Sequence, residues 1–168
     1  NNWAVLASTG CDPGASIFAA QGGAFVINDM EGSGCTGNEG GNNDNIMQIG
    51  PVNVSGAGCL EVNYLVDAVS GSGFEIGAPG GDLLKVTTIV DGTTFNAQVF
   101  QANGQIINIG QKRIPIPFSA NTVSILIEGG TQSKGEVFSV SGVSILDVSY
   151  TPSIPDFPVC KDELFNLN

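Results

Sequence analysis

The sequence contains no histidine among its 168 residues. Without an imidazole, Ser-His-Asp catalysis, Cys-His catalysis and histidine-containing zinc sites are all excluded. No serine lies in a G-x-S-x-G turn, and no glycine-rich stretch opens a helix or runs into Gly-Lys-Ser/Thr, so neither a hydrolase nucleophile nor a nucleotide site is indicated. Paired carboxylates can hydrolyse glycosides, but no suitable pair can be identified in the chain. We therefore expect no enzymatic activity.

Positive charge is also scarce. Five Lys and Arg residues face 16 Asp and Glu residues, which gives a net charge of −11. Nucleic acid and anionic membranes bind clustered basic residues, and only Lys112 and Arg113 are adjacent. No stretch approaches the roughly 20 apolar residues of a membrane span. We therefore expect no nucleic-acid partner and no membrane insertion. Calcium is the natural counter-charge, although the acidic residues could also serve only solubility.

Cysteine is present but never in the CxxC spacing of zinc ribbons and redox sites. The four cysteines are Cys11, Cys35, Cys59 and Cys160. Their even number in a loop-rich, acidic chain predicts two disulfides and an oxidising compartment. Three pairings are possible, and the sequence does not choose among them. No signal peptide is visible, so we expect a mature segment or an excised domain.

The strongest pattern in the sequence is a predicted β-hairpin at residues 81–101. Two runs rich in Val, Ile, Thr and Phe flank Asp91-Gly92, two residues that tolerate positive φ. Such a pair suits a two-residue type I′ turn, whose twist matches that of paired strands. The pattern predicts antiparallel strands near residues 82–90 and 93–100.

Alternation of apolar and polar residues predicts further strands on both sides of the hairpin. Residues 59–68 place Val62, Tyr64, Val66 and Ala68 on one face, as in a half-buried antiparallel sheet. Residues 122–128 alternate in the same way, with Val123, Ile125 and Ile127 on one face. Residues 3–8 and 16–20 are short apolar runs, which we expect to form peripheral strands.

Proline and glycine predict where strands bend or lie at an edge. Pro51 marks an edge or a bend in its strand, and Pro115 with Pro117 predicts an edge strand, because proline cannot donate to a second neighbour. Gly142 interrupts a long run, residues 136–150, and predicts a bulge or bend there.

No helix of useful length is indicated. About ten predicted strands separated by glycine-rich turns predict an all-β, two-sheet antiparallel sandwich. Residues 36–45 read as a long polar loop. We expect one domain over residues 1–150, followed by a Pro-rich linker or tail over residues 151–168.

Several carboxylates are predicted at strand ends or in loops, where calcium could also reach backbone carbonyls. Asp29 and Glu31 are two residues apart and would project from the same face of a strand. The candidate calcium ligands are Asp29, Glu31, Asp44, Glu75, Asp82 and Glu136. Scattered, solvated acidic residues are the alternative interpretation.

Aromatic residues suited to sugar binding are few. The chain has one Trp, two Tyr and nine Phe, and we expect Tyr64, Tyr150 and the phenylalanines in the core. This argues against a flat aromatic platform but leaves open a calcium-assisted sugar pocket formed by Asn, Asp and Gln. Asn53-Val54-Ser55 is a glycosylation sequon, informative only in a eukaryotic source.

Three short motifs together carry a resemblance to a known family. They are an acidic, glycine-containing segment that ends in Cys (29–35), an Asp-led strand that enters an Asp-Gly hairpin (82–93), and Gly135-Glu136 before the last strand. These motifs are similar to jelly-roll modules of large secreted and surface proteins of Bacteroidetes, including gliding-motility adhesins and adhesin-associated domains. The resemblance covers roughly residues 24–150. It departs at Ser141-Gly142, where the family often has Asp-Asn.

The resemblance implies a jelly-roll-type β-sandwich without enzymatic activity, located outside the cell at the cell surface. We expect an adhesion or structural module that is stabilised by calcium. Its expected partners are surface polysaccharide or neighbouring repeats of the same polypeptide. The alternative is a carbohydrate-binding module attached to a secreted enzyme.

Overall fold

The computed structural model describes residues 3–7, 17–28, 46–70, 82–102, 105–106, 109–131 and 135–148. Within these ranges the chain forms twelve β-strands and no helix. The strands are β1 (Trp3–Ala7), β2 (Ile17–Gln21), β3 (Ala24–Asn28), β4 (Ile46–Asn53), β5 (Leu60–Ser70), β6 (Leu83–Val90), β7 (Thr93–Val99), β8 (Gln101–Ala102), β9 (Gln105–Ile106), β10 (Gly110–Ile116), β11 (Thr122–Gly130) and β12 (Glu136–Asp147).

Strands β6 and β7 form the predicted hairpin. They pair antiparallel, and Asp91 and Gly92 between them have φ angles of +49° and +77°. Positive φ at both central residues is the type I′ conformation, so the turn prediction is confirmed. The register shifts between Thr88 and Ile89, which makes Phe95 the extra residue of a bulge in β7.

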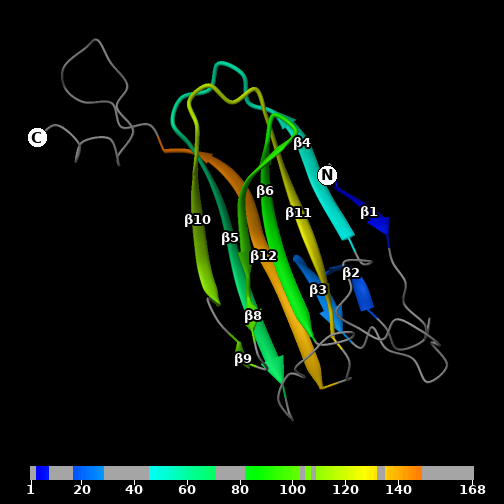
Figure 1. Cartoon of the computed structure of the whole chain (residues 1–168). Coiled ribbons are helices and arrows are strands. Elements are labelled where there is room, and N and C mark those ends of the chain that lie inside the picture. Colours follow the sequence, from blue (N-terminus) through cyan, green and yellow to red (C-terminus); the bar gives the residue numbers. More distant parts are fainter. Residues whose placement is uncertain are drawn as a thin grey trace, which may run out of the picture.

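Ten of the strands form two five-stranded sheets that face each other (Figure 1). One sheet has the order β1-β4-β11-β6-β7, and the other has the order β10-β5-β12-β3-β2. From β3 to β12 the chain passes from one of these sheets to the other at every connection except the β6–β7 hairpin, and the small β8–β9 ribbon lies on the way from β7 to β10. The resulting order is that of a jelly roll. The expected all-β, jelly-roll-type antiparallel sandwich is therefore the fold of this chain.

Alternation along each strand directs one set of side chains between the sheets. In β5, Val62, Tyr64 and Val66 are buried, while Leu65 and Asp67 are exposed. In β11 the predicted inward set is confirmed as buried. The core contains Phe25, Ile27, Met47, Val54, Val62, Tyr64, Val66, Leu84, Val86, Phe100, Ile114, Ile116, Ala120, Val123, Ile125, Ile127, Phe138 and Val140. This core holds the two sheets together.

The predicted edges and bends are present. β1 and β2 are edge strands of the two sheets, and β10, which contains Pro115, is an edge strand as well. Gly142 has a φ of +60° and lies where the β12–β5 register shifts between Ser141 and Ser144. Pro51 lies where the β4–β11 register shifts. Each shift adds one residue to its strand and bends it.

Some predictions fall outside the described residues. They concern the long polar loop 36–45, the tail 151–168 and the domain boundary at residue 150, and they stay predictions. No helix in the described part of the chain has the length and apolar character needed to cross a membrane.

Candidate functional site

Three connections meet at one end of the sandwich, here called the loop end. They are the β4–β5 loop (54–59), the β6–β7 turn (91–92) and the β10–β11 turn (117–121). The backbone N–H of Val54 donates to the Asn121 carbonyl at 2.8 Å, and that of Asp91 donates to the Thr122 carbonyl at 3.0 Å. These bonds link all three connections, so the loop end is one continuous surface.

The carboxylate of Asp91 is the centre of this arrangement. Its Oδ1 accepts the backbone N–H of Thr122 at 2.8 Å and that of Asn121 at 2.9 Å. The Asn121 amide and the Thr122 hydroxyl also donate to the carboxylate, at 3.5 and 3.3 Å. The Thr122 N–H, with further help from Asn121, lowers the pKa of Asp91 below its ordinary value. Asp91 therefore acts as a charged clamp between two loops.

Phe118 stands on the turn that Asp91 holds. Its side chain is 67% exposed, the largest exposed fraction among the exposed large apolar residues of the described chain. Ala120, two residues later, is 5% exposed and donates its N–H to the Pro117 carbonyl at 3.0 Å. The turn is thus anchored in the core while its aromatic ring remains in water.

Polar side chains surround the same loop end. Asn53, Ser55, Ser119 and Asn121 are all exposed. Asn53 Oδ1 accepts the Ser55 N–H at 2.9 Å, which fixes the sequon segment in an Asx-type turn. The loop end therefore combines one exposed aromatic ring with amide and hydroxyl groups.

The expectation that all phenylalanines are core residues is wrong for two of them. Phe25, Phe100 and Phe138 are buried, but Phe118 is exposed and Phe95 is 46% exposed. Phe95 is exposed because it is the extra residue of the β7 bulge. Phe118 is exposed because it occupies a tight turn, and the sequence signal for that turn is Pro117 followed by Ser119 and Asn121.

Tyr64 lies in the core, as predicted. Its ring meets Phe100 edge-on, with centroids 6.5 Å apart, and the Lys112 ammonium lies 5.7 Å from the centroid of Phe100. Burial raises the pKa of Tyr64 to about 12. Tyr64 is therefore neither a stacking surface for a ligand nor a proton donor near neutral pH.

The predicted calcium ligands divide into two groups. Asp29, Glu31, Asp44 and Glu75 lie outside the described residues. Asp82 and Glu136 are described, and they are 2% and 0% exposed. No group of three or more Asp, Glu, Cys or His residues able to hold a metal occurs in the part of the chain that the structure describes.

Asp82 and Glu136 lie at the same end of the sandwich, opposite the loop end and here called the base. Leu83, next to Asp82, pairs with Gly130 at the end of β11, and residues 131–135 join that end to Glu136. Asn28 donates its Nδ2 to the Glu136 carbonyl at 2.9 Å, so β3 ends at the base too. The base therefore brings two buried carboxylates to the same end of the sandwich, and carboxylate and carbonyl oxygens are the donor set of calcium.

Of the predicted disulfide cysteines, only Cys59 is described. It is 2% exposed and disulfide-bonded, with its partner among Cys11, Cys35 and Cys160, which lie outside the described residues. Cys59 is the last residue of the β4–β5 loop, so its disulfide starts from the loop end. There its carbonyl accepts the Val148 N–H at 2.7 Å, where β12 finishes.

No protein-family model and no curated protein matches the sequence. Among solved structures, the chain is similar to the tandem CBM51 modules of the family 98 glycoside hydrolase from Streptococcus pneumoniae, with 13% identity and a TM-score of 0.36. That match covers 86% of this chain and 47% of the other, so the chain spans about half of its length. A family 35 carbohydrate binding module from an environmental isolate matches with 17% identity and a TM-score of 0.31, over 83% of this chain and 96% of the other. Similarities with TM-scores this low carry no argument about function, which has to come from the residues.

Proposed function

We propose that this chain is a non-catalytic extracellular module that binds carbohydrate at the loop end. The observation that carries the proposal is Phe118, an aromatic ring left 67% exposed on an anchored turn. Leaving such a ring in water gives up about 1 to 2 kcal/mol of the stabilising free energy that its burial would provide. An aromatic face held rigidly beside amide and hydroxyl groups suits a sugar ring, which has one apolar face and a polar rim.

The polar groups at the loop end support the same ligand. Asn53, Ser55 and Asn121 offer neutral donors and acceptors, which match hydroxyl groups without demanding a charge on the ligand. These residues belong to segments fixed by hydrogen bonds, namely the Asx-type turn and the Asp91 clamp. Preorganised groups lose less entropy when a ligand binds.

A glycan array tests this proposal with three proteins. The wild type should bind a defined set of glycans, and Phe118→Ala should weaken that binding by about tenfold or more, the loss expected of a stacking ring. Phe95→Ala is the matched control, because Phe95 is also an exposed phenylalanine but lies in the β7 bulge. Binding of no glycan, or equal binding by Phe118→Ala and the wild type, would contradict the proposal.

A second candidate function is the adhesive or structural module of a larger surface protein. It is favoured by exposed apolar residues on the outer face of the β10-β5-β12-β3-β2 sheet. Leu65, Val69 and Leu146 are 45%, 61% and 48% exposed there. Such a face suits contact with a neighbouring domain or repeat.

Hydrogen exchange tests this second candidate in a polypeptide that carries two copies of the chain in tandem. If the copies dock through this face, the backbone amides of Leu65 and Val69 should exchange more slowly than in the single module, because docking stabilises the sheet against the openings through which these amides exchange. Identical exchange rates in the tandem protein and the single module would count against contact between repeats.

Calcium and an extracellular location belong to the proposal as well. Buried Asp82 and Glu136 at the base provide two oxygen donors of the kind calcium takes. A disulfide-bonded Cys59 suits an oxidising compartment. In this arrangement calcium would stiffen the base, and sugar contacts would be made at the loop end.

A further inference from the structure

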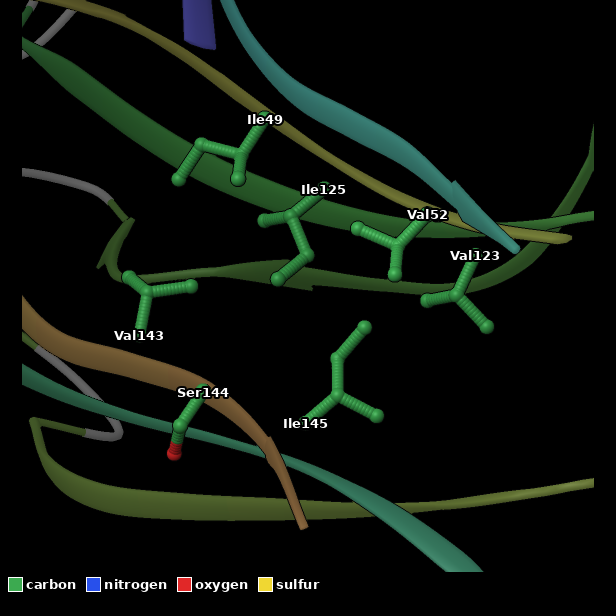
Figure 2. Close-up of a pocket in the computed structure, with 7 residues that line it drawn as sticks. All are labelled: Ile49, Val52, Val123, Ile125, Val143, Ser144 and Ile145. Atoms are coloured by element: carbon green, nitrogen blue, oxygen red, sulfur yellow. The ribbon is translucent and has the colours of Figure 1, made fainter. Parts of the chain in front are cut away.

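Two strand bulges in opposite sheets line one cavity. The β4–β11 register shifts between Val123 and Ile125, and the β12–β5 register shifts between Ser141 and Ser144. Between these irregular segments lies a cavity of about 290 Å³. Its lining residues are Ile49, Val52, Val123, Ile125, Val143, Ser144 and Ile145 (Figure 2). Bulges bend strands, and here they leave space between the sheets that the side chains do not fill.

The wall of this cavity is aliphatic. Figure 2 shows side chains of β4 and β11 reaching from one sheet towards Val143 and Ile145 of β12. Ser144 supplies the one polar side chain of the lining, and its hydroxyl points away from the space enclosed by the others. A ligand there would mainly contact branched aliphatic side chains.

The cavity continues towards the surface. A second space of about 410 Å³ shares Ile49 and Val143 with the first. It passes Gly142 and reaches Ala20 and Gly23, which are exposed at the β2–β3 turn. The residues that line this second space therefore extend from the first cavity to the exposed β2–β3 turn.

We propose that this cavity binds a small uncharged aliphatic molecule, a role separate from carbohydrate binding at the loop end. The lining side chains are almost all aliphatic and offer little to a polar or ionised group, which would lose most of its hydration without compensation. The net charge of −11 further disfavours anions. A cavity of about 150 Å³ accommodates benzene, so this one has room for roughly twelve non-hydrogen atoms.

The first test uses 1-octanol as the probe, because its nine non-hydrogen atoms fit the cavity, and measures its binding by isothermal titration calorimetry. Val143→Phe places a ring in the cavity and should weaken probe binding by about tenfold or more. Val69→Phe is the matched control, since Val69 is 61% exposed on the outer face of β5. It should bind the probe as the wild type does. Absence of probe binding to the wild type, or unchanged binding by folded Val143→Phe, would overturn the proposal.

A second measurement keeps the test decisive if Val143→Phe does not fold. Isoleucine methyl groups of the wild-type protein are labelled with ¹³C and followed by NMR as 1-octanol is added. The methyl signals of Ile49, Ile125 and Ile145 should shift, while those of Ile89 and Ile109 stay in place. Shifts confined to exposed isoleucines such as Ile109 would indicate surface adsorption and count against the cavity as the site.

Discussion

At the scale of single residues, Asp91 serves two purposes that are usually separate. Its backbone adopts the positive φ of the hairpin turn, and its carboxylate holds the neighbouring loop through the N–H groups of Asn121 and Thr122. Aspartate can do both because it tolerates this conformation better than most residues and carries a short acceptor side chain. The loop that carries Phe118 thus depends on a residue from a different hairpin.

We predict that Asp91→Ala lowers the melting temperature more than Asp91→Asn does. Alanine removes the acceptor and strains the positive φ, whereas asparagine tolerates that φ and keeps an acceptor oxygen. Thermal unfolding followed by circular dichroism measures both. Melting temperatures of both variants equal to that of the wild type would show that the clamp does not contribute to stability.

Asp91 should also affect how the free energy of unfolding changes at acidic pH. Its pKa is lowered in the folded chain, chiefly by the Thr122 N–H. The contribution is therefore fully present above the ordinary aspartate pKa of about 3.9 and is lost as the pH falls through the lower, folded value. The free energy of unfolding, measured with a chemical denaturant from neutral pH down to about pH 3, should show this loss in the wild type but not in Asp91→Asn. Asp67→Asn, which changes an exposed aspartate on β5, should retain it.

The alternation of residues accounts for most of the strands, because it reports burial of one face. It correctly identifies Val62, Tyr64 and Val66 as buried and Asp67 as exposed, but Asn63 on the outer face is buried as well. It cannot identify Phe118 or Phe95, since phenylalanine is apolar wherever it stands, and exposure depends on a turn or a bulge. Alternation therefore misses the loop-end site, although the residues around Phe118 carry a turn signal.

At the scale of elements, an ion pair joins β6 to β11. Lys85 Nζ lies 2.9 Å from Glu128 Oε2, and the two residues are register partners. The exposed fraction of the side chain is 8% for Glu128 and 33% for Lys85. The carboxylate is thus largely removed from water and depends on its partner for compensation.

We predict that Lys85→Met destabilises the chain by about 1 to 2 kcal/mol, because it leaves a largely buried carboxylate without its cation. The double variant Lys85→Met/Glu128→Leu should recover most of that loss, since an apolar pair needs no compensation. Urea unfolding of the wild type, both single variants and the double variant gives the coupling energy. If the double variant is as unstable as the sum of the two single variants, the pair does not act as a unit.

At the scale of the whole molecule, the order of strands results from pairings between distant segments. β3 pairs with β12, so that Asn28 lies opposite Val137, more than a hundred residues later. Local alternation contains no information about such partners, and only the number of strands and the absence of helix can be predicted from it. The jelly-roll order is expected from resemblance alone. The base is one product of that order, because it brings Asp82 and Glu136 to the same end.

The proposed calcium site at the base can be tested by removing divalent ions. Removal of divalent ions with EDTA should lower the melting temperature by several degrees, since a ligand that binds only the folded state adds stability. The shift should disappear in Asp82→Asn and Glu136→Gln, whose carboxylates are buried at the base, and persist in Asp67→Asn, whose carboxylate is exposed. Because the net charge is −11, any cation could stabilise the chain by screening. Sodium chloride at matched ionic strength separates that effect from specific binding. If EDTA leaves the melt unchanged, or if sodium restores it as well as calcium does, the two carboxylates form part of the fold without holding an ion.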